Sequence, residues 1–178
     1  MVLLAVILFI LVTLIFVWGR PHLRRMKAQD DMFAARYVQR QQEVLALSVE
    51  DAYRQAELLL VNPQKFYCIP LAQPAENFDV LAPNLQALFS RFKTIEAVDT
   101  EYFLERELIS PFGWDCEESP WRKHQFWQIG AGHEHSIILV KPHQEGVYDT
   151  DGTDDDLEEP SYPTIYHWLL MAASDFSL

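Results

Sequence analysis

The strongest constraint on this chain is an uninterrupted apolar stretch close to its start. Residues 2–19 (VLLAVILFILVTLIFVWG) carry no charge, and Thr13 is their only polar side chain. At about 1.5 Å per residue, such a stretch spans roughly 27 Å as a helix, close to the hydrocarbon thickness of a bilayer. A cleavable signal peptide needs a basic segment ahead of it, a shorter apolar region and a small-residue cleavage site. A buried core helix would keep some polar face. The sequence therefore predicts a single transmembrane anchor over residues 1–19.

Basic residues follow this anchor rather than precede it. Arg20, Arg24, Arg25 and Lys27 lie directly behind the apolar stretch. Lys and Arg close to a membrane span stay on the cytoplasmic side, where anionic lipids also attract them. We expect a single-pass protein of the bacterial inner membrane, with its N-terminus outside and its C-terminal domain in the cytoplasm. Only two cysteines occur in the chain, which agrees with a reducing compartment.

Charge is divided unevenly along the chain. Residues 20–40 hold six basic and two acidic side chains, a net charge of +4. The remaining eight basic and 24 acidic side chains lie beyond residue 40 and give −16, so that the whole chain carries −12. A body this acidic does not bind nucleic acid by neutralising phosphates. It would attract and steer a cationic protein, although solubility alone also explains such a charge.

Three regions follow from the pattern of elements. After the anchor, residues 20–61 form a basic juxtamembrane segment and a helical stalk. Ser48 is followed by an acid at the third position, the capping-box pattern, and apolar residues then recur at helical spacing as far as Leu60. Residues 62–178 form the third region, a single α+β domain, which is long enough to build a core.

Within this domain, short strands are predicted at residues 65–69, 94–98 and 107–110. A helix is expected to open at Pro83, and a capped helix with an apolar stripe closes the chain after residues 161–164. Strands near 124–129, 135–141 and 147–148, with short connections between them, predict an antiparallel meander whose middle strand is covered on both faces. The predicted fold is an N-terminal transmembrane helix followed by one domain with an antiparallel sheet packed against helices.

His133 and His135 form the most tempting chemical site. On a strand they would project from one face, close enough to share a metal ion. A third ligand is not evident at a recognisable spacing, although His124 on a neighbouring strand would approach them. We expect polar turn residues here rather than a metal site.

An acidic segment at residues 149–159 resembles a calcium loop at first sight. An EF-hand requires a glycine at the sixth position and a glutamate at the twelfth. Counting from Asp149 or from Asp151 gives neither, so that only an irregular calcium site stays open. We expect a solvated loop that contacts a partner protein through its aspartates. The candidate partner-binding residues are Asp149, Asp151, Asp154, Asp155 and Asp156.

Motifs for covalent catalysis and nucleotide binding are missing from the sequence. The serines lie in no nucleophile elbow, the cysteines have no local signature, and no glycine-rich phosphate loop is complete. The sequence therefore predicts no catalytic residue, no cofactor and no metal.

Several short motifs in the C-terminal half occur together. They are the strand Phe126-Trp127-Gln128-Ile129-Gly130, the apolar residues 137–140, the run GVYDTD at 146–151, an acidic loop and an aromatic-rich terminal helix. Over roughly residues 83–174 this arrangement resembles the SUKH superfamily, whose members share a W-x-I-G strand, a G-x-V-Y strand and a closing helix. The family's early E-x-x-L-G-x-x-L-P signature is absent, unless APNL at 82–85 is its remnant. The resemblance implies an α+β domain that binds and blocks a toxin, without catalytic residues.

The leading functional prediction is thus a membrane-anchored, non-enzymatic protein-binding domain, an immunity protein whose partner is a cationic toxin domain. The alternative is an anchored scaffold or regulatory subunit of a membrane or envelope assembly. A metal-dependent hydrolase that uses the His133 and His135 region comes third.

Overall fold

The computed structural model describes residues 2–72, 79–98, 100–112, 125–132, 136–151 and 158–174, without the side chains of residues 2–22 and 108. The chain divides into two units, α1 up to Gln41 and the body from Gln42 to Asp175, and each is described by itself. The described elements are α1 (Val2–Leu45), α2 (Val49–Leu60), β1 (Phe66–Pro70), α3 (Pro83–Arg91), β2 (Phe92–Ala97), β3 (Phe103–Glu105), the 3₁₀-helix η1 (Arg106–Leu108), β4 (Ser110–Pro111), β5 (Trp127–Ala131), β6 (Ile137–Val140), β7 (Val147–Thr150) and α4 (Ile165–Ala172).

Helix α1 contains both the apolar stretch and the residues that follow it. Its backbone is one continuous helix from Val2 to Leu45, so that the first part of the predicted stalk (residues 20–61) belongs to this element. Among the residues whose side chains are described, no helix is long and apolar enough to cross a bilayer. The predicted span at residues 2–19 lies outside those residues.

Helix α2 begins where the sequence predicts a cap. The Asp51 N–H donates to Ser48 Oγ at 3.1 Å, and the Ser48 hydroxyl donates to the Asp51 carboxylate at 2.7 Å. The helix buries Ala52, Ala56 and Leu60 on one face, and it packs against α4. Helix α2 was expected in the stalk, but this apolar face makes it part of the body.

The body is an α+β fold with an antiparallel sheet, as predicted, and this sheet has seven strands. The strand order is β1-β2-β3-β5-β6-β7, and β4 pairs with β5. The predicted meander is confirmed, because β5 pairs with β6 and β6 with β7. Its middle strand buries Ile138, Leu139 and Val140, and since neighbours along a strand face opposite sides, β6 is covered on both faces.

The strand predicted at residues 107–110 is largely wrong. Residues 106–108 form the 3₁₀-helix η1, which is closed by a bond from the Ile109 N–H to the Arg106 carbonyl. Strands β3 and β4, on either side of η1, both pair with β5. They behave as one strand that this turn interrupts.

Gly130 lies inside β5, opposite Leu104. A Cβ atom at this position would lie 2.2 Å from the carbonyl oxygen of Phe103. Glycine is required here because β3 approaches β5 so closely.

Cross-strand pairing defines two faces of the sheet. Paired residues on neighbouring strands point to the same face, and successive residues on one strand point to opposite faces. One row across the sheet comprises Cys68, Ile95, Leu104, Gly130, Ile138 and Asp149, and the next, on the other face, comprises Tyr67, Glu96, Phe103, Ala131, Ile137 and Thr150.

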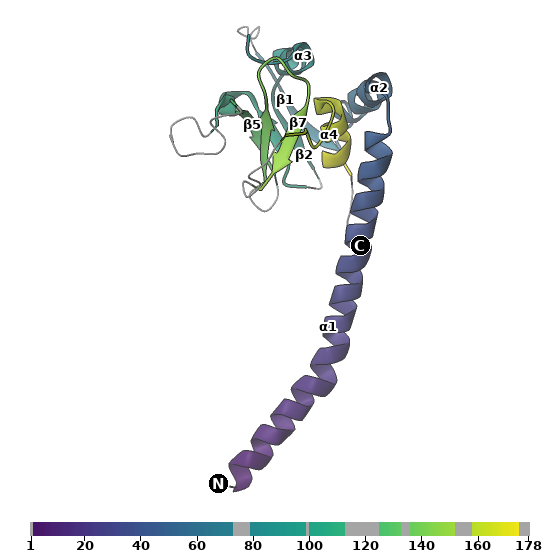
Figure 1. The fold of residues 1–178 in the computed structure, drawn as a ribbon, viewed down its shortest axis with the longest axis vertical. Helices are drawn as coiled ribbons and strands as arrows, with labels where there is room; N and C mark the ends of the chain where they lie inside the picture. The colour runs from purple at the N-terminus through teal and green to yellow at the C-terminus, as the bar shows by residue number, and fades with distance from the viewer. Residues whose placement is uncertain are drawn as a thin grey trace. The chain divides into compact units, whose positions relative to one another are not determined.

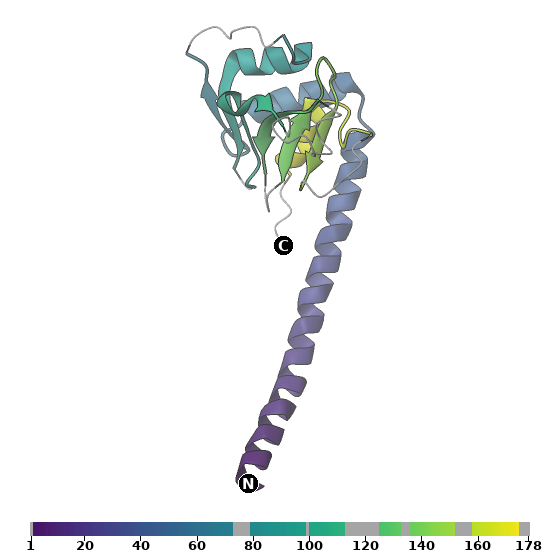
Figure 2. The ribbon, with the colours of Figure 1, turned by 60° about the vertical axis from the view of Figure 1, so that its left-hand side comes forward.

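Helices α2 and α4 cover the face of the first row (Figures 1 and 2). Cys68 contacts Leu60 of α2, and Trp168 of α4 contacts Asp149. Every residue of α4 is buried, as expected for a helix that is packed on all sides. The second row lies on the opposite face, which we call the open face because no described α-helix covers it.

The two ends of the open face differ. Over β5, β6 and β7, an apolar cluster of Phe126, Leu139 and Tyr148 is buried, with Ile137 packed against it. The Phe126 and Tyr148 rings meet edge to face, with their centroids 4.8 Å apart. Over β1, β2 and β3, the side chains are instead exposed or half-buried.

Candidate protein-binding surface

Asp149 does not lie in a solvated loop, and that expectation is wrong. It belongs to β7, and its carboxylate is partly buried beneath α4. The indole Nε1–H of Trp168 donates to Asp149 Oδ2 at 3.1 Å, and the Ser136 hydroxyl donates to Oδ1. The Asp149 N–H also donates to Ser161 Oγ at 3.1 Å. The carboxylate therefore joins α4 to the sheet and is not available to a partner.

Burial raises the pKa of Asp149 above its ordinary value, and the hydrogen bonds from Ser136 and Trp168 oppose the rise. Burial wins because removing a carboxylate from water disfavours its charged form. Within the described residues, hydrogen bonds from Ser136 and from Trp168 of α4 hold the carboxylate, which gives it a structural role.

Of the other aspartates and the histidines predicted to form sites, only Asp151 is described. Asp151 is exposed at the end of β7. Asp154, Asp155 and Asp156 lie outside the described residues, as do His124, His133 and His135. Among the described residues, no group of three or more metal-ligating side chains is close enough to hold an ion.

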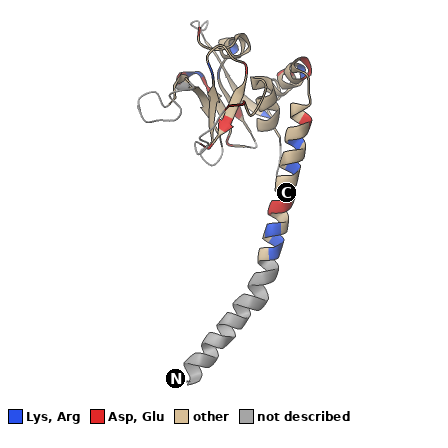
Figure 3. Ribbon diagram, in the orientation of Figure 1, with Lys and Arg blue, Asp and Glu red and all other residues tan. Residues whose placement is uncertain are grey.

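The predicted basic flank of the apolar stretch is exposed where it is described. Arg24, Arg25 and Lys27 lie on α1 with exposed side chains, and Figure 3 shows basic residues along the described part of this helix. The side chain of Arg20 is not described. Contact of these four side chains with lipid headgroups stays a prediction.

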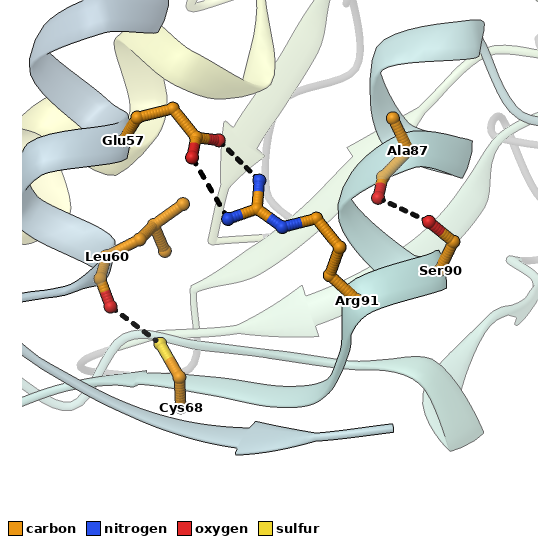
Figure 4. A network of polar contacts seen from close by, with 6 residues as sticks. All are labelled: Glu57, Leu60, Cys68, Ala87, Ser90 and Arg91. Atoms are coloured by element: carbon orange, nitrogen blue, oxygen red, sulfur yellow. Dashed lines mark hydrogen bonds and ion pairs between the residues drawn. The ribbon is translucent and has the colours of Figure 1, made fainter. Parts of the chain in front are cut away.

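In the body, several cations are occupied within the chain. The Arg91 guanidinium makes two hydrogen bonds to the Glu57 carboxylate, at 2.6 and 2.9 Å (Figure 4). Lys93 pairs with Glu107 at 2.7 Å. Lys141 lies over two rings, 5.3 Å from the centroid of Phe126 and 4.9 Å from that of Tyr148. These pairings leave the body with a surplus of carboxylates.

The polar contacts around Arg91 link α2, α3 and β1 and stabilise the fold. The hydrogen bond to Glu57 raises the pKa of Arg91, so this ion pair between α2 and the end of α3 stays charged. Burial raises the pKa of the Cys68 thiol, and the thiol contacts the Leu60 carbonyl (Figure 4). A thiol with a raised pKa is a poor nucleophile at neutral pH. The network therefore offers no catalytic group.

The exposed part of the open face is the best candidate surface for a partner. We call it the β1–β3 patch and define it as Tyr67, Ile69, Thr94, Glu96, Phe103 and Glu105. Tyr67 is 61 % exposed and Ile69 36 % exposed, although both are large and apolar. Glu96 is exposed between Tyr67 and Phe103.

Sequence reasoning missed this patch. The alternation of buried and exposed residues is present in β1 and β2, but it does not say which strands become neighbours. Glu96 and Phe103 meet only because β2 and β3 pair in this register. Predicting that β1 pairs with β2 and β2 with β3, in this register, would have identified the patch.

No family model matches the chain, and no curated protein or solved structure matches it. The resemblance to the SUKH superfamily, and the function that it implies, stay predictions.

Proposed function

We propose that this chain is a membrane-anchored, non-enzymatic protein-binding domain that recognises a cationic partner. The observation that carries the proposal is the β1–β3 patch, where aromatic and aliphatic side chains are exposed beside the Glu96 carboxylate, which no described ion pair neutralises. Interfaces gain most of their affinity from such aromatic anchors, and complementary charge speeds association.

The narrower form of the proposal is an immunity protein. In this role the domain binds a toxin in the bacterial cytoplasm and blocks it, while the apolar residues 2–19 hold it at the inner membrane. The basic side chains behind that stretch support the N-out orientation, and the net charge of −16 beyond residue 40 supports a basic toxin domain.

The test begins with a photo-crosslinking amino acid at position 67 of the full chain, in the membranes of its native cell. A matched chain carries the same group at Leu58, an equally exposed apolar position on α2. A partner captured from position 67 and not from position 58 is then purified for kinetics. We expect its association rate to fall as salt rises, because screening shortens the reach of the charges to about 8 Å at physiological ionic strength.

The acidic loop is tested with the same partner. Asp151, Asp154, Asp155 and Asp156 are changed together to Asn, and Asp149 is left intact because it joins α4 to the sheet. Slower association with an unchanged dissociation rate supports charge steering by this loop. An association rate that ignores both salt and these substitutions would refute recognition of a cationic partner.

A second candidate function has one observation in its favour. Apolar side chains are exposed on α1, with Leu23 64 %, Met26 47 % and Met32 50 % exposed. Exposed apolar residues along one helix favour contact with other proteins, as in a scaffold or regulatory subunit of a membrane assembly. Crosslinks from Met26 to envelope proteins, with none from position 67, would favour this scaffold over the immunity protein.

A further inference from the structure

We infer that Tyr67, Glu96 and Phe103 form a seat for an arginine side chain of the partner. This inference rests on the proposed function and names the chemistry that the surface recognises. The three residues lie side by side on β1, β2 and β3, because Tyr67 pairs with Glu96 and Glu96 with Phe103. Directly paired residues on neighbouring strands have Cβ atoms about 5 Å apart. The carboxylate therefore has an aromatic residue on each side.

Glu96 is available for an external cation. It is exposed, and across the described part of the chain no ion pair or side-chain hydrogen bond engages its carboxylate. Glu105 adds a second carboxylate on the same face, opposite Thr94. The charge of Lys93, which also interacts with Glu105, is held mainly by Glu107.

The two aromatic residues are available as well. Within the described residues, neither Tyr67 nor Phe103 takes part in a ring–ring or cation–ring contact. Other aromatic rings of this body do carry a cation of the chain: the Arg91 guanidinium lies 4.8 Å from the centroid of Phe92. The open face thus repeats an arrangement that the body already uses, but without the cation.

Arginine fits this arrangement better than lysine. Its planar guanidinium bonds a carboxylate through two N–H groups and stacks on aromatic faces at the same time. A lysine ammonium makes the ion pair as a point charge and has no plane to stack. The occupant is therefore a surface arginine of a basic protein, with its aliphatic stem against Ile69 or Tyr67.

The probe for this seat is a pair of acetylated, amidated peptides, one with three arginines and one with three lysines. Both are titrated against the full chain in detergent micelles, in low salt. We expect the arginine peptide to bind severalfold more tightly than the lysine peptide. Glu96→Gln and Tyr67→Leu should each weaken binding of the arginine peptide about two- to fivefold, and the arginine preference should shrink in both.

Glu145→Gln, in the turn between β6 and β7, is the matched control. It removes the same charge from an exposed carboxylate outside the patch, and we expect less than a twofold effect. Tyr67→Leu keeps an apolar side chain and removes only the aromatic ring, and thermal unfolding confirms that each variant folds. Equal losses in Glu96→Gln and Glu145→Gln, or equal binding of both peptides, would overturn the seat.

The seat and the proposed function can fail separately. If the captured partner shows salt-dependent association but is indifferent to Glu96→Gln and Tyr67→Leu, the binding function stands and the arginine seat falls. If no partner is captured at position 67 but the arginine peptide still binds more tightly than the lysine peptide, and Glu96→Gln weakens its binding, the arginine seat is supported and the proposed function is refuted.

Discussion

The Trp168 indole donates a hydrogen bond to the Asp149 carboxylate at 3.1 Å. This contact joins α4, which is buried on every side, to β7 at the edge of the sheet. The rings of Tyr102 and Trp168 pack edge to face, with their centroids 5.7 Å apart. A segment predicted from its composition to be a solvated acidic loop thus begins with a residue that holds the fold together.

The buried carboxylate of Asp149 should make the free energy of unfolding depend on pH. Burial raises the pKa of Asp149 in the folded chain. Its contribution to stability is therefore fully present below the ordinary pKa of an aspartate and is lost as pH rises through the raised value. Asn keeps a carbonyl acceptor and does not ionise, so that Asp149→Asn should become more stable relative to the parent chain as pH rises through this window. Chemical unfolding of the micelle-bound chain at a series of pH values measures this difference.

Comparison of Asp149→Ala with Asp149→Asn separates hydrogen bonding from charge at this position. Asp149→Ala leaves the Trp168 N–H without its acceptor, and we expect a loss of about 1–3 kcal/mol in the free energy of unfolding. Asp149→Asn keeps a carbonyl acceptor for this N–H and should lose less than Asp149→Ala at low pH. A difference between Asp149→Asn and the parent chain that stays constant across this pH window would contradict the assignment.

The Glu57–Arg91 pair should contribute more to stability than a similar pair nearby. It joins α2 to the end of α3 through two bonds, and its side chains are 25 % and 43 % exposed. Glu50 and Arg54 form the matched pair within α2, where both side chains are about two-thirds exposed or more, at 73 % and 68 %. Double-mutant cycles should give about 0.5–1 kcal/mol for the first pair and less than about 0.5 for the second.

Arg91→Lys refines the same prediction. Lysine keeps the charge and loses the two-bond geometry, so most of the coupling with Glu57 should disappear. Coupling of equal size in Arg91→Lys and in the parent chain would show that charge alone matters at this position.

Gly130→Ala should destabilise the sheet by several kcal/mol. The new Cβ atom would lie 2.2 Å from a backbone oxygen of β3, which cannot rotate away. Gly132→Ala is the comparison, because its Cβ would meet side chains rather than backbone, namely the ring of Tyr102 and, at 3.2 Å, the Ser136 hydroxyl. Unfolding in denaturant measures both. A smaller loss at position 130 than at position 132 would mean that β3 and β5 separate more easily than their pairing suggests.

The orientation of the chain is tested with reporters. A reporter that is active only in the cytoplasm, fused after residue 178, should be active, because the basic side chains follow the apolar residues 2–19. Changing Arg20, Arg24, Arg25 and Lys27 to Gln should lower this activity, because it removes the positive charge that keeps this segment on the cytoplasmic side. Activity of a periplasmic reporter at the same position in the parent chain would show that the orientation is wrong.

Local features of the fold could be predicted from the sequence. Ser48 and Asp51 produce the cap of α2 because both partners lie within four residues of each other. Pro83 opens α3, where a missing N–H costs nothing. The meander of β5, β6 and β7 follows from short connections between apolar runs.

The sequence alone therefore determined elements whose causes are local: caps, helix starts and hairpin-like neighbours. Only the tertiary structure decided that β2 and β3 place Glu96 beside Phe103, that Gly130 serves a close strand contact, and that Asp149 is partly buried beneath α4. The physical reason is that alternation along a strand assigns side chains to faces but carries no record of which strand lies next to it. Burial of an acid and assembly of a surface both depend on those neighbours, and neighbours far apart in the chain are selected by the packing of the whole core.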